Sequence, residues 1–259
     1  MHTWGDADAP PLVCLHGVTA HGRRFRRLAE EHLASRWRVL APDLRGHGFS
    51  EWEPPWTFAT HMHDVLETLD AHGVRRAAFL GHSFGGRLVL ELAALVPERV
   101  HVAVLLDPAI DLLPHVGFDW AEHERADAVF DSPEDAIAAR LEGGWPTPRE
   151  FLEEEMREHL VEGADGRFRY RYCQSMAVSV FGEFCTPPPP PETLRAPTLL
   201  LYANAFGLVR EEHIGAYTAA LGDRLRVATV PGGHMVYWDA YAQTVDEVVR
   251  FLEDPGAER

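Results

Sequence analysis

Short apolar runs alternate along this chain with longer stretches in which apolar residues recur at helical spacing. Each run is bounded by Gly, Pro, Asp or His and is too short for a typical helix, so we expect buried strands. The strands are expected at 12–15, 37–41, 76–80, 100–106, 198–202 and 224–230, and the helices at about 23–34, 57–72, 84–95, 210–221 and 238–253. This alternation predicts an α/β fold with a mostly parallel central sheet and helices on both faces.

The alternation is interrupted after Asp107 by an interval much longer than an ordinary connection between a strand and a helix. We therefore expect a core formed by residues 1–107 and 196–259, and a helical cap, 108–195, inserted between two strands. Such an insertion is expected to cover a site at the carboxyl ends of the parallel strands. A stiff polyproline tether, "TPPPPP" at 186–191, leads back to the sheet.

Two segments of the expected cap carry helix-start signals. In "DSPEDAIAARLEGG" the expected N-cap is Asp131 or Ser132, and a proline takes the first helical position. In "TPREFLEEEMREHLVEG" the expected N-cap is Thr147, with Glu150 as its capping-box partner. Between the cap helices and the tether, "DGRFRYRY" places an aromatic residue at every second position, which predicts a short strand after a turn.

The most informative local pattern is a glycine-rich corner, "LGHSFGG", between an expected strand and an expected helix. It fits G-x-S-x-G with Ser83 at its centre. A sharp strand-to-helix turn strains the backbone of the serine, and glycines on both sides avoid the clashes that side chains would cause. The start of the helix also supplies N–H groups without intrahelical partners, close to where negative charge would develop. The setting predicts that Ser83 is a nucleophile.

At this corner the sequence resembles the α/β-hydrolase superfamily, and in particular its capped, single-domain, esterase-like members. Four motifs carry the resemblance in the family's order: "LHGVT" at 15–19, "DLRGHGFS" at 43–50, "GHSFGG" at 81–86 and "PGGHMVYWD" at 231–239. The resemblance implies that His234 is the catalytic base. It also implies that the backbone N–H groups of Val18 and Phe84 form the oxyanion hole.

The triad acid is where the chain departs from the family pattern. The acid usually follows a late strand, in a G-x-x-D corner, but here that corner reads "LLLYANAFGLVREE" and puts Phe206 where the aspartate belongs. Phenylalanine can neither orient an imidazole nor offset the charge of an imidazolium. Asp107 ends the strand expected at 100–106, where some members of the family carry the acid, and it is our preferred candidate. The alternatives are Glu211, Glu212, Asp111 or no acid at all.

Composition and charge narrow the classes of function. The formal net charge is −16 and lysine is absent, so binding to nucleic acid and Schiff-base chemistry are not expected. No apolar run is long enough to span a membrane, and the start "MHTWGDADAPP" does not resemble a signal peptide. The three cysteines, Cys14, Cys173 and Cys185, have no metal-binding spacing and read as free thiols. We therefore expect a cytoplasmic protein.

The expected activity is hydrolysis of a small carboxylic ester or lactone through an acyl-enzyme, without cofactor or metal. His82 and the cap aromatics Phe118, Trp120 and Trp145 are expected to line the substrate pocket. Cleavage of C–C bonds or amides, and perhydrolysis, use the same triad and remain open, because the cap and the leaving-group pocket decide among them. A ligand-binding protein of the same fold with little turnover is a further alternative.

The start of the sheet is expected to be short. The superfamily normally has one or two antiparallel strands before "LHG", but only about eleven residues precede the first expected strand here. We therefore expect the first strand to be missing, which would leave an exposed edge able to pair with a second copy. The expected state is a monomer or a homodimer.

Overall fold

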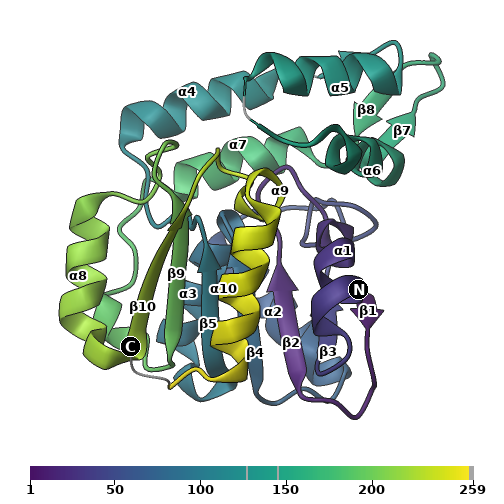
Figure 1. The fold of residues 1–259 in the computed structure, drawn as a ribbon. Helices are drawn as coiled ribbons and strands as arrows, with labels where there is room; N and C mark the ends of the chain where they lie inside the picture. The colour runs from purple at the N-terminus through teal and green to yellow at the C-terminus, as the bar shows by residue number, and fades with distance from the viewer. Residues whose placement is uncertain (127, 145, 257–259) are drawn as a thin grey trace.

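The computed structural model describes residues 1–126, 128–144 and 146–256 (Figure 1). Its centre is a seven-stranded sheet with the order β1-β3-β2-β4-β5-β9-β10. The strands are β1 His2–Trp4, β2 Pro11–Leu15, β3 Arg38–Ala41, β4 Ala77–His82, β5 Val100–Leu106, β9 Thr198–Ala203 and β10 Leu225–Val230. All neighbours are parallel except β1, which runs antiparallel to β3. The predicted α/β fold with a mostly parallel sheet is confirmed.

Helices cover both faces of this sheet, as the alternation of the sequence predicts (Figure 1). On β2, Val13 and Leu15 pack into one core and Leu12 and Cys14 into the other, because successive strand residues point to opposite faces. The first core is covered by α2 Phe58–Ala71, α3 Phe84–Leu95 and α8 Glu211–Leu221. The second is covered by α1 Arg26–Leu28 and α10 Tyr241–Glu253.

Two of the expected helices are broken in the structure. The segment expected as one helix at 23–34 consists of a 3₁₀ turn, α1 and a π-helical turn over Gly22–Phe25, Arg26–Leu28 and Ala29–Leu33. The segment expected at 238–253 is divided into α9, Val236–Asp239, and α10. The break falls at Ala240, whose φ of −131° is not helical.

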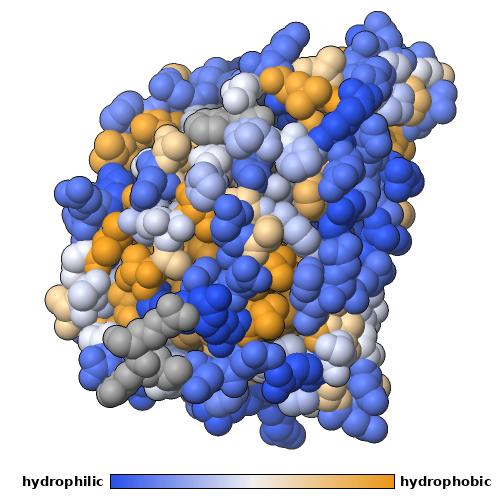
Figure 2. Space-filling model, in the orientation of Figure 1, coloured by the Kyte–Doolittle hydropathy of each residue, from blue (hydrophilic) through white to orange (hydrophobic). Residues whose placement is uncertain are grey.

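The edge of the sheet beside β3 is not bare. The residues before "LHG" include β1, whose three residues pair with Val39, Leu40 and Ala41. The expectation of a missing strand is therefore wrong for this edge, since one short antiparallel strand is present. Gly5 follows β1 with φ +87°, a left-handed conformation that glycine adopts easily. This turn lets the chain reverse within the few residues between β1 and β2. At the other edge of the sheet, Val227 of β10 is exposed. Apolar residues also reach the surface elsewhere on the face seen in Figure 2.

The segment between β5 and β9, which we call the cap, forms a layer over the carboxyl ends of the parallel strands (Figure 1). Its helices are α4 Pro114–Arg125, α5 Pro133–Glu142, α6 Arg149–His159 and α7 Gln174–Glu183. The layer is not purely helical, because β6 Val129–Phe130, β8 Phe168–Tyr170 and β7 Leu160–Glu162 form a small antiparallel sheet. None of the helices described here has the length and apolar character that crossing a membrane requires.

The helix starts of the cap follow the sequence signals at one of two places. Ser132 caps α5, and its hydroxyl accepts the N–H of Asp135. At α6 the expectation is wrong, because the N-cap is Pro148 and Thr147 does not cap the helix. The hydroxyl of Thr147 instead donates to the carboxylate of Asp239, on the core. A tertiary hydrogen bond has replaced the local one.

Buried histidines make the stability of the fold depend on pH. Burial lowers the pKa of His47 to about 4 and that of His61 to about 3. In the unfolded chain both titrate near their ordinary value of about 6.5, so below that pH the unfolded state binds protons that the folded state does not. Their contribution to stability is therefore complete above about pH 6.5 and is lost as the pH falls from there toward 4.

We expect the free energy of unfolding to fall below pH 6.5 by about 1.4 kcal/mol per pH unit for each such histidine. His61 packs edge-on against Phe84, and neither ring nitrogen has a hydrogen-bond partner among the described residues. His61→Leu should therefore make the fall shallower, as urea unfolding at pH 7.5 and pH 5.0 would show. An equally steep fall in the variant would contradict this assignment.

Candidate active site

Ser83 lies at a strained turn between β4 and α3, with φ +54° and ψ −112°. The glycines around it are required by space. A Cβ at Gly81 would collide with the carbonyl group of Gly85, and a Cβ at Gly85 would collide with that of Leu15. Strain of this kind persists only where surrounding structure imposes it, and it occurs preferentially at functional sites. The structure thus places Ser83 in the sharp turn that the sequence predicts.

The two residues predicted to supply the oxyanion hole lie beside Ser83. Phe84 is the first residue of α3, where backbone N–H groups have no intrahelical acceptor. The adjacent N–H groups of Ser83 and Gly85 already donate to carbonyl oxygens of Leu106 and His16. Val18 follows Gly17 in the chain. A Cβ added at Gly17 would lie 3.3 Å from the Cβ of Ser83, so this loop approaches the serine closely. The arrangement fits a pair of backbone donors next to the hydroxyl.

Asp107 and His234 come together although 127 positions separate them. The Nδ1 atom of His234, in the loop after β10, is 2.6 Å from Oδ2 of Asp107. Asp107 is fully buried at the end of β5 and has φ +40°. Its Oδ1 accepts the N–H of Ala203 at 3.3 Å. The carboxylate is thus held in place by the neighbouring strand and faces the imidazole.

The alternative acids have other partners. Asp111 accepts from Nη2 of Arg210 at 2.6 Å and pairs with Nε2 of His213 at 2.8 Å. Glu212 pairs with Nε of Arg210 at 2.6 Å, and Glu211 lies exposed at the start of α8. Among the candidates that the sequence left open, Asp107 is therefore the one that meets His234.

Two aromatic rings flank the His234 imidazole. The ring of Phe206 stacks on it with centroids 4.8 Å apart and planes 16° apart. The ring of His82 lies 4.6 Å away at 39°, and its Nε2 is 2.9 Å from the carbonyl oxygen of His234. Since a carbonyl oxygen can only accept, Nε2 of His82 donates. Burial lowers the pKa of His82 well below its ordinary value, which keeps this ring neutral.

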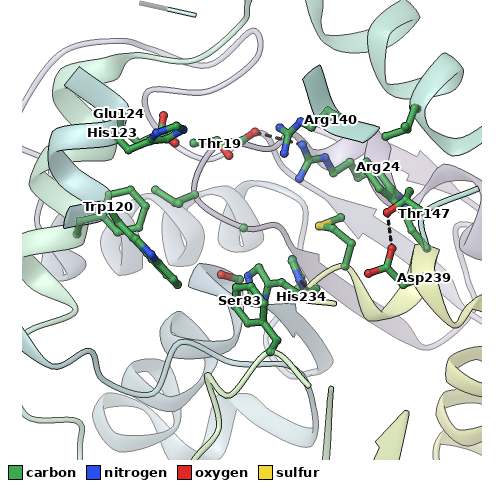
Figure 3. Close-up of a pocket in the computed structure, with 18 of the residues that line it drawn as sticks. Thr19, Arg24, Ser83, Trp120, His123, Glu124, Arg140, Thr147, His234 and Asp239 are labelled. Atoms are coloured by element: carbon green, nitrogen blue, oxygen red, sulfur yellow. Dashed lines mark hydrogen bonds between the residues drawn. The ribbon is translucent and has the colours of Figure 1, made fainter. Parts of the chain in front are cut away.

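A cavity of about 320 Å³ lies between the cap and the sheet, and Ser83 and His234 point into it (Figure 3). Its apolar wall consists of Trp120, Leu152, Phe181, Phe184, Phe206 and Trp238. Its polar side groups come from Thr19, Arg24, His123, Glu124, Arg140 and Asp239. A mostly apolar cavity with a few converging polar groups is typical of small-molecule sites.

The predicted pocket residues differ in where they lie. His82 and Trp120 line the cavity, and Trp120 faces Ser83 from α4 (Figure 3). Phe118 does not line it and is 63% exposed, so that expectation is wrong. Residues two apart on a helix point in different directions, and of these two aromatic residues Trp120 is the one that faces the cavity. Trp145 lies outside the residues that the structure describes.

A buried ion pair that was not expected from the sequence joins the cap to the core. Arg24 of the core donates through Nε to both carboxylate oxygens of Glu155, on α6, at 3.0 Å. Burial alone would raise the pKa of Glu155, but the charges of Arg24 and of nearby His21 hold it well below its ordinary range. The complementary runs "RRFRR" and "EFLEEE" were the signal available in the sequence.

The same cluster contains residue types that could hold a metal ion. One ligand atom each of His21, Glu155 and His159 lie within 4.8 Å of one another, and all three residues are buried. However, the guanidinium of Arg24 already neutralises Glu155, so a divalent cation would add uncompensated charge to a buried site. The geometry favours a structural ion pair at this place.

Removing the charge of Glu155 should destabilise the protein strongly. In Glu155→Gln the Arg24 guanidinium, whose side chain is 5% exposed, would stay buried without a counter-charge. We expect a loss of about 3–5 kcal/mol in the free energy of unfolding, measured with urea at pH 7.5. The matched control is Glu158→Gln, one turn along α6, where the pair with Arg23 is more exposed and should cost less than about 1 kcal/mol. Equal losses in both variants would contradict the assignment.

Comparison with known proteins extends these findings. The profile of a family described as "alpha/beta hydrolase fold" matches residues 10–142. The protein "Lipase LipV" of Mycobacterium tuberculosis is 33% identical over 244 residues, which cover 91% of this chain and 90% of that protein. "Esterase YbfF" of Escherichia coli is 29% identical over 162 residues, which cover 62% and 61%. The crystal structure of E-2-(acetamidomethylene)succinate hydrolase covers 97% of this chain and 93% of its own, with a TM-score of 0.84 and 22% identity.

Proposed function

This chain belongs to the α/β-hydrolase family, and from that premise we propose that it cleaves carboxylic esters or lactones through an acyl-enzyme on Ser83. Its relatives named lipase and esterase support a serine hydrolase of this fold. The observation that carries the assignment of the site is the 2.6 Å contact between Nδ1 of His234 and Oδ2 of Asp107. This contact lies at the edge of the sheet that carries Ser83.

The proposed reaction begins with activation of the serine. With Nδ1–H donated to Asp107, Nε2 of His234 carries the lone pair that takes the proton from Oγ of Ser83. Oγ attacks the carbonyl carbon, and the carbonyl π electrons move to the oxygen. The N–H groups of Val18 and Phe84 stabilise the negative charge on that oxygen. Asp107 keeps its negative charge and stabilises the imidazolium.

The second half returns the enzyme to its starting state. The tetrahedral intermediate collapses, the C–O bond to the leaving alcohol breaks, and the proton on Nε2 of His234 passes to that alcohol. Water then takes the place of the alcohol and loses its proton to Nε2 as it attacks the acyl carbon. As the bond to Oγ breaks, the proton on Nε2 of His234 passes to Oγ, which releases the acid and restores Ser83 and the neutral imidazole. In a lactone the leaving alcohol is part of the same molecule, so the ring opens to a hydroxyacyl-enzyme and water releases a single hydroxy acid.

The cavity supports a small substrate with an apolar part. Trp120, Phe181 and Phe184 would receive an acyl or aryl group above Ser83, and a volume of about 320 Å³ lies at the lower end of the range for small-molecule sites. The proposal requires no cofactor and no metal. The alternative of ligand binding without turnover was motivated by the missing acid at position 206, and the contact between Asp107 and His234 supports an enzyme instead.

One substrate panel tests the proposal. It contains p-nitrophenyl esters of graded acyl length, several lactones and aryl amides, all at pH 7.5. We expect turnover of esters or lactones, and labelling of the wild type by a fluorophosphonate probe. Turnover of amides alone would redirect the assignment to amide hydrolysis. A folded wild type that neither turns over a substrate nor takes up the probe would contradict the proposed function.

A further inference from the structure

We propose that Phe206 is a positioning residue, whose ring fixes the plane of the His234 imidazole and stabilises the imidazolium formed during the reaction. This inference rests on the function proposed above. In the corner where the family usually carries its acid, this chain carries Phe206, whose ring contacts the face of the His234 imidazole. The carboxylate reaches the histidine from another strand.

The hydrogen bond to Asp107 leaves one freedom of the imidazole unrestrained. It fixes Nδ1 at 2.6 Å from Oδ2, but it does not prevent the ring from tilting about that contact, and a tilt would displace Nε2 from the position that the proposed proton transfer requires. The centroid of the Phe206 ring is 4.8 Å from that of the imidazole, and the two planes are 16° apart. A tilt of the imidazole would therefore push it against the Phe206 ring. The hydrogen bond and the stack therefore restrain the imidazole in different directions.

The backbone of His234 is held separately. Its carbonyl oxygen accepts from Nε2 of His82 at 2.9 Å, and His82 is itself buried. Phe206 is anchored by its own turn, in which its N–H donates to the carbonyl oxygen of Ala203 at 3.2 Å. Ala203 in turn donates to Oδ1 of Asp107. The acid and the stacking ring are thus attached to the same end of β9, so their relation to His234 is fixed together.

The stack also has an electrostatic consequence. When His234 takes the proton of Ser83 it becomes a cation that lies against the face of Phe206, and a cation over an aromatic face is stabilised. The other ring in contact with His234 is that of His82, which is neutral and therefore does not repel the imidazolium. Phe206 neither gains nor loses a bond or proton in any step. Its contribution should appear in steps where the imidazolium forms.

Phe206 also lines the cavity, where the centroid of its ring is 6.2 Å from that of the Trp120 ring. A wall residue and a positioning residue have different kinetic signatures. Loss of a wall contact raises KM, and the effect grows with the acyl chain that touches the wall. Loss of positioning lowers kcat by the same factor for short and long acyl chains, because the imidazolium is common to both.

The test compares Phe206→Leu with Phe206→Tyr on p-nitrophenyl acetate and hexanoate. Leucine keeps an apolar side chain but removes the flat face, and tyrosine keeps the face. We expect Phe206→Leu to lower kcat about tenfold on both esters with KM changed less than about twofold. Phe206→Tyr should restore kcat to within about twofold of the wild type. The rate of fluorophosphonate labelling should fall in parallel with kcat, because it reports activation of Ser83 alone.

Three results would overturn the inference. One is an unchanged kcat with a KM that rises more for the hexanoate. Another is equal impairment of the leucine and tyrosine variants, and the third is wild-type labelling of Phe206→Leu. Thermal unfolding of the variants shows whether they fold, and Phe206→Met, which also lacks a flat face, carries the test in place of the leucine variant if that variant does not fold. A wild type without turnover or labelling contradicts the proposed function itself, whereas normal labelling of wild type and Phe206→Leu alike contradicts this inference alone.

Discussion

Replacing Ser83 with alanine is expected to lower kcat for ester hydrolysis by about 10⁵- to 10⁶-fold, the effect of removing a triad nucleophile. Without Oγ no acyl-enzyme can form, and His234 has no proton to take. The residual rate would come from the oxyanion donors and from substrate binding, which do not involve the serine side chain. Steady-state rates with p-nitrophenyl acetate measure the loss, and a fluorophosphonate probe should no longer label the protein.

The alanine variant should keep the fold, which makes the measurement interpretable. The backbone N–H of Ser83 donates to the carbonyl oxygen of Leu106, and its own carbonyl oxygen accepts from the N–H groups of Arg87 and Ala109; none of these bonds uses the hydroxyl. Alanine has the same Cβ as serine, so the backbone strain at φ +54° is unchanged. We expect the urea midpoint to remain at its wild-type value. Turnover by the folded variant at more than a hundredth of the wild-type rate would exclude Ser83 as the nucleophile.

Asp107→Asn is expected to lower kcat by about 10⁴-fold with little change in KM. An asparagine amide can donate to Nδ1 of His234, and this fixes the tautomer that carries its proton on Nε2. That nitrogen then has no lone pair for the proton of Ser83, and the imidazolium loses its counter-charge. The loss should be in kcat because Asp107 is fully buried and does not line the cavity.

Asparagine suits this position structurally. It adopts left-handed backbone angles more readily than most residues, so φ +40° is tolerated, and its carbonyl oxygen can still accept the N–H of Ala203. The matched control is Asp111→Asn, which removes a carboxylate bound to Arg210 and His213. We expect the control to retain kcat to within about threefold. Near-normal turnover of Asp107→Asn would assign the acid elsewhere, and a large loss in Asp111→Asn would point to that residue.

Local patterns were sufficient to predict most of the fold. The strand β5 and the helix α3 begin and end at the expected residues, because their signals lie within the segments themselves. Two of the failures depend on contacts with distant parts of the chain. Thr147 has the sequence of an N-cap, yet its hydroxyl donates to Asp239 from the core. Phe118 and Trp120 look alike in sequence, and only the packing of α4 decides which of them faces the cavity.

For the candidate site, the turn of Ser83 could be predicted from local sequence, since the strand, the glycines and the helix are contiguous there and their steric requirements are local. It also reduced the triad acid to a few carboxylates. Three contacts could be seen only in the folded chain: Asp107 meets His234, Phe206 stacks on the same ring, and Arg24 is buried against Glu155. All three have the same cause. Each contact joins segments whose separation is set by the packing of strands and cap, and no periodicity along the chain records which side chains will meet across that distance.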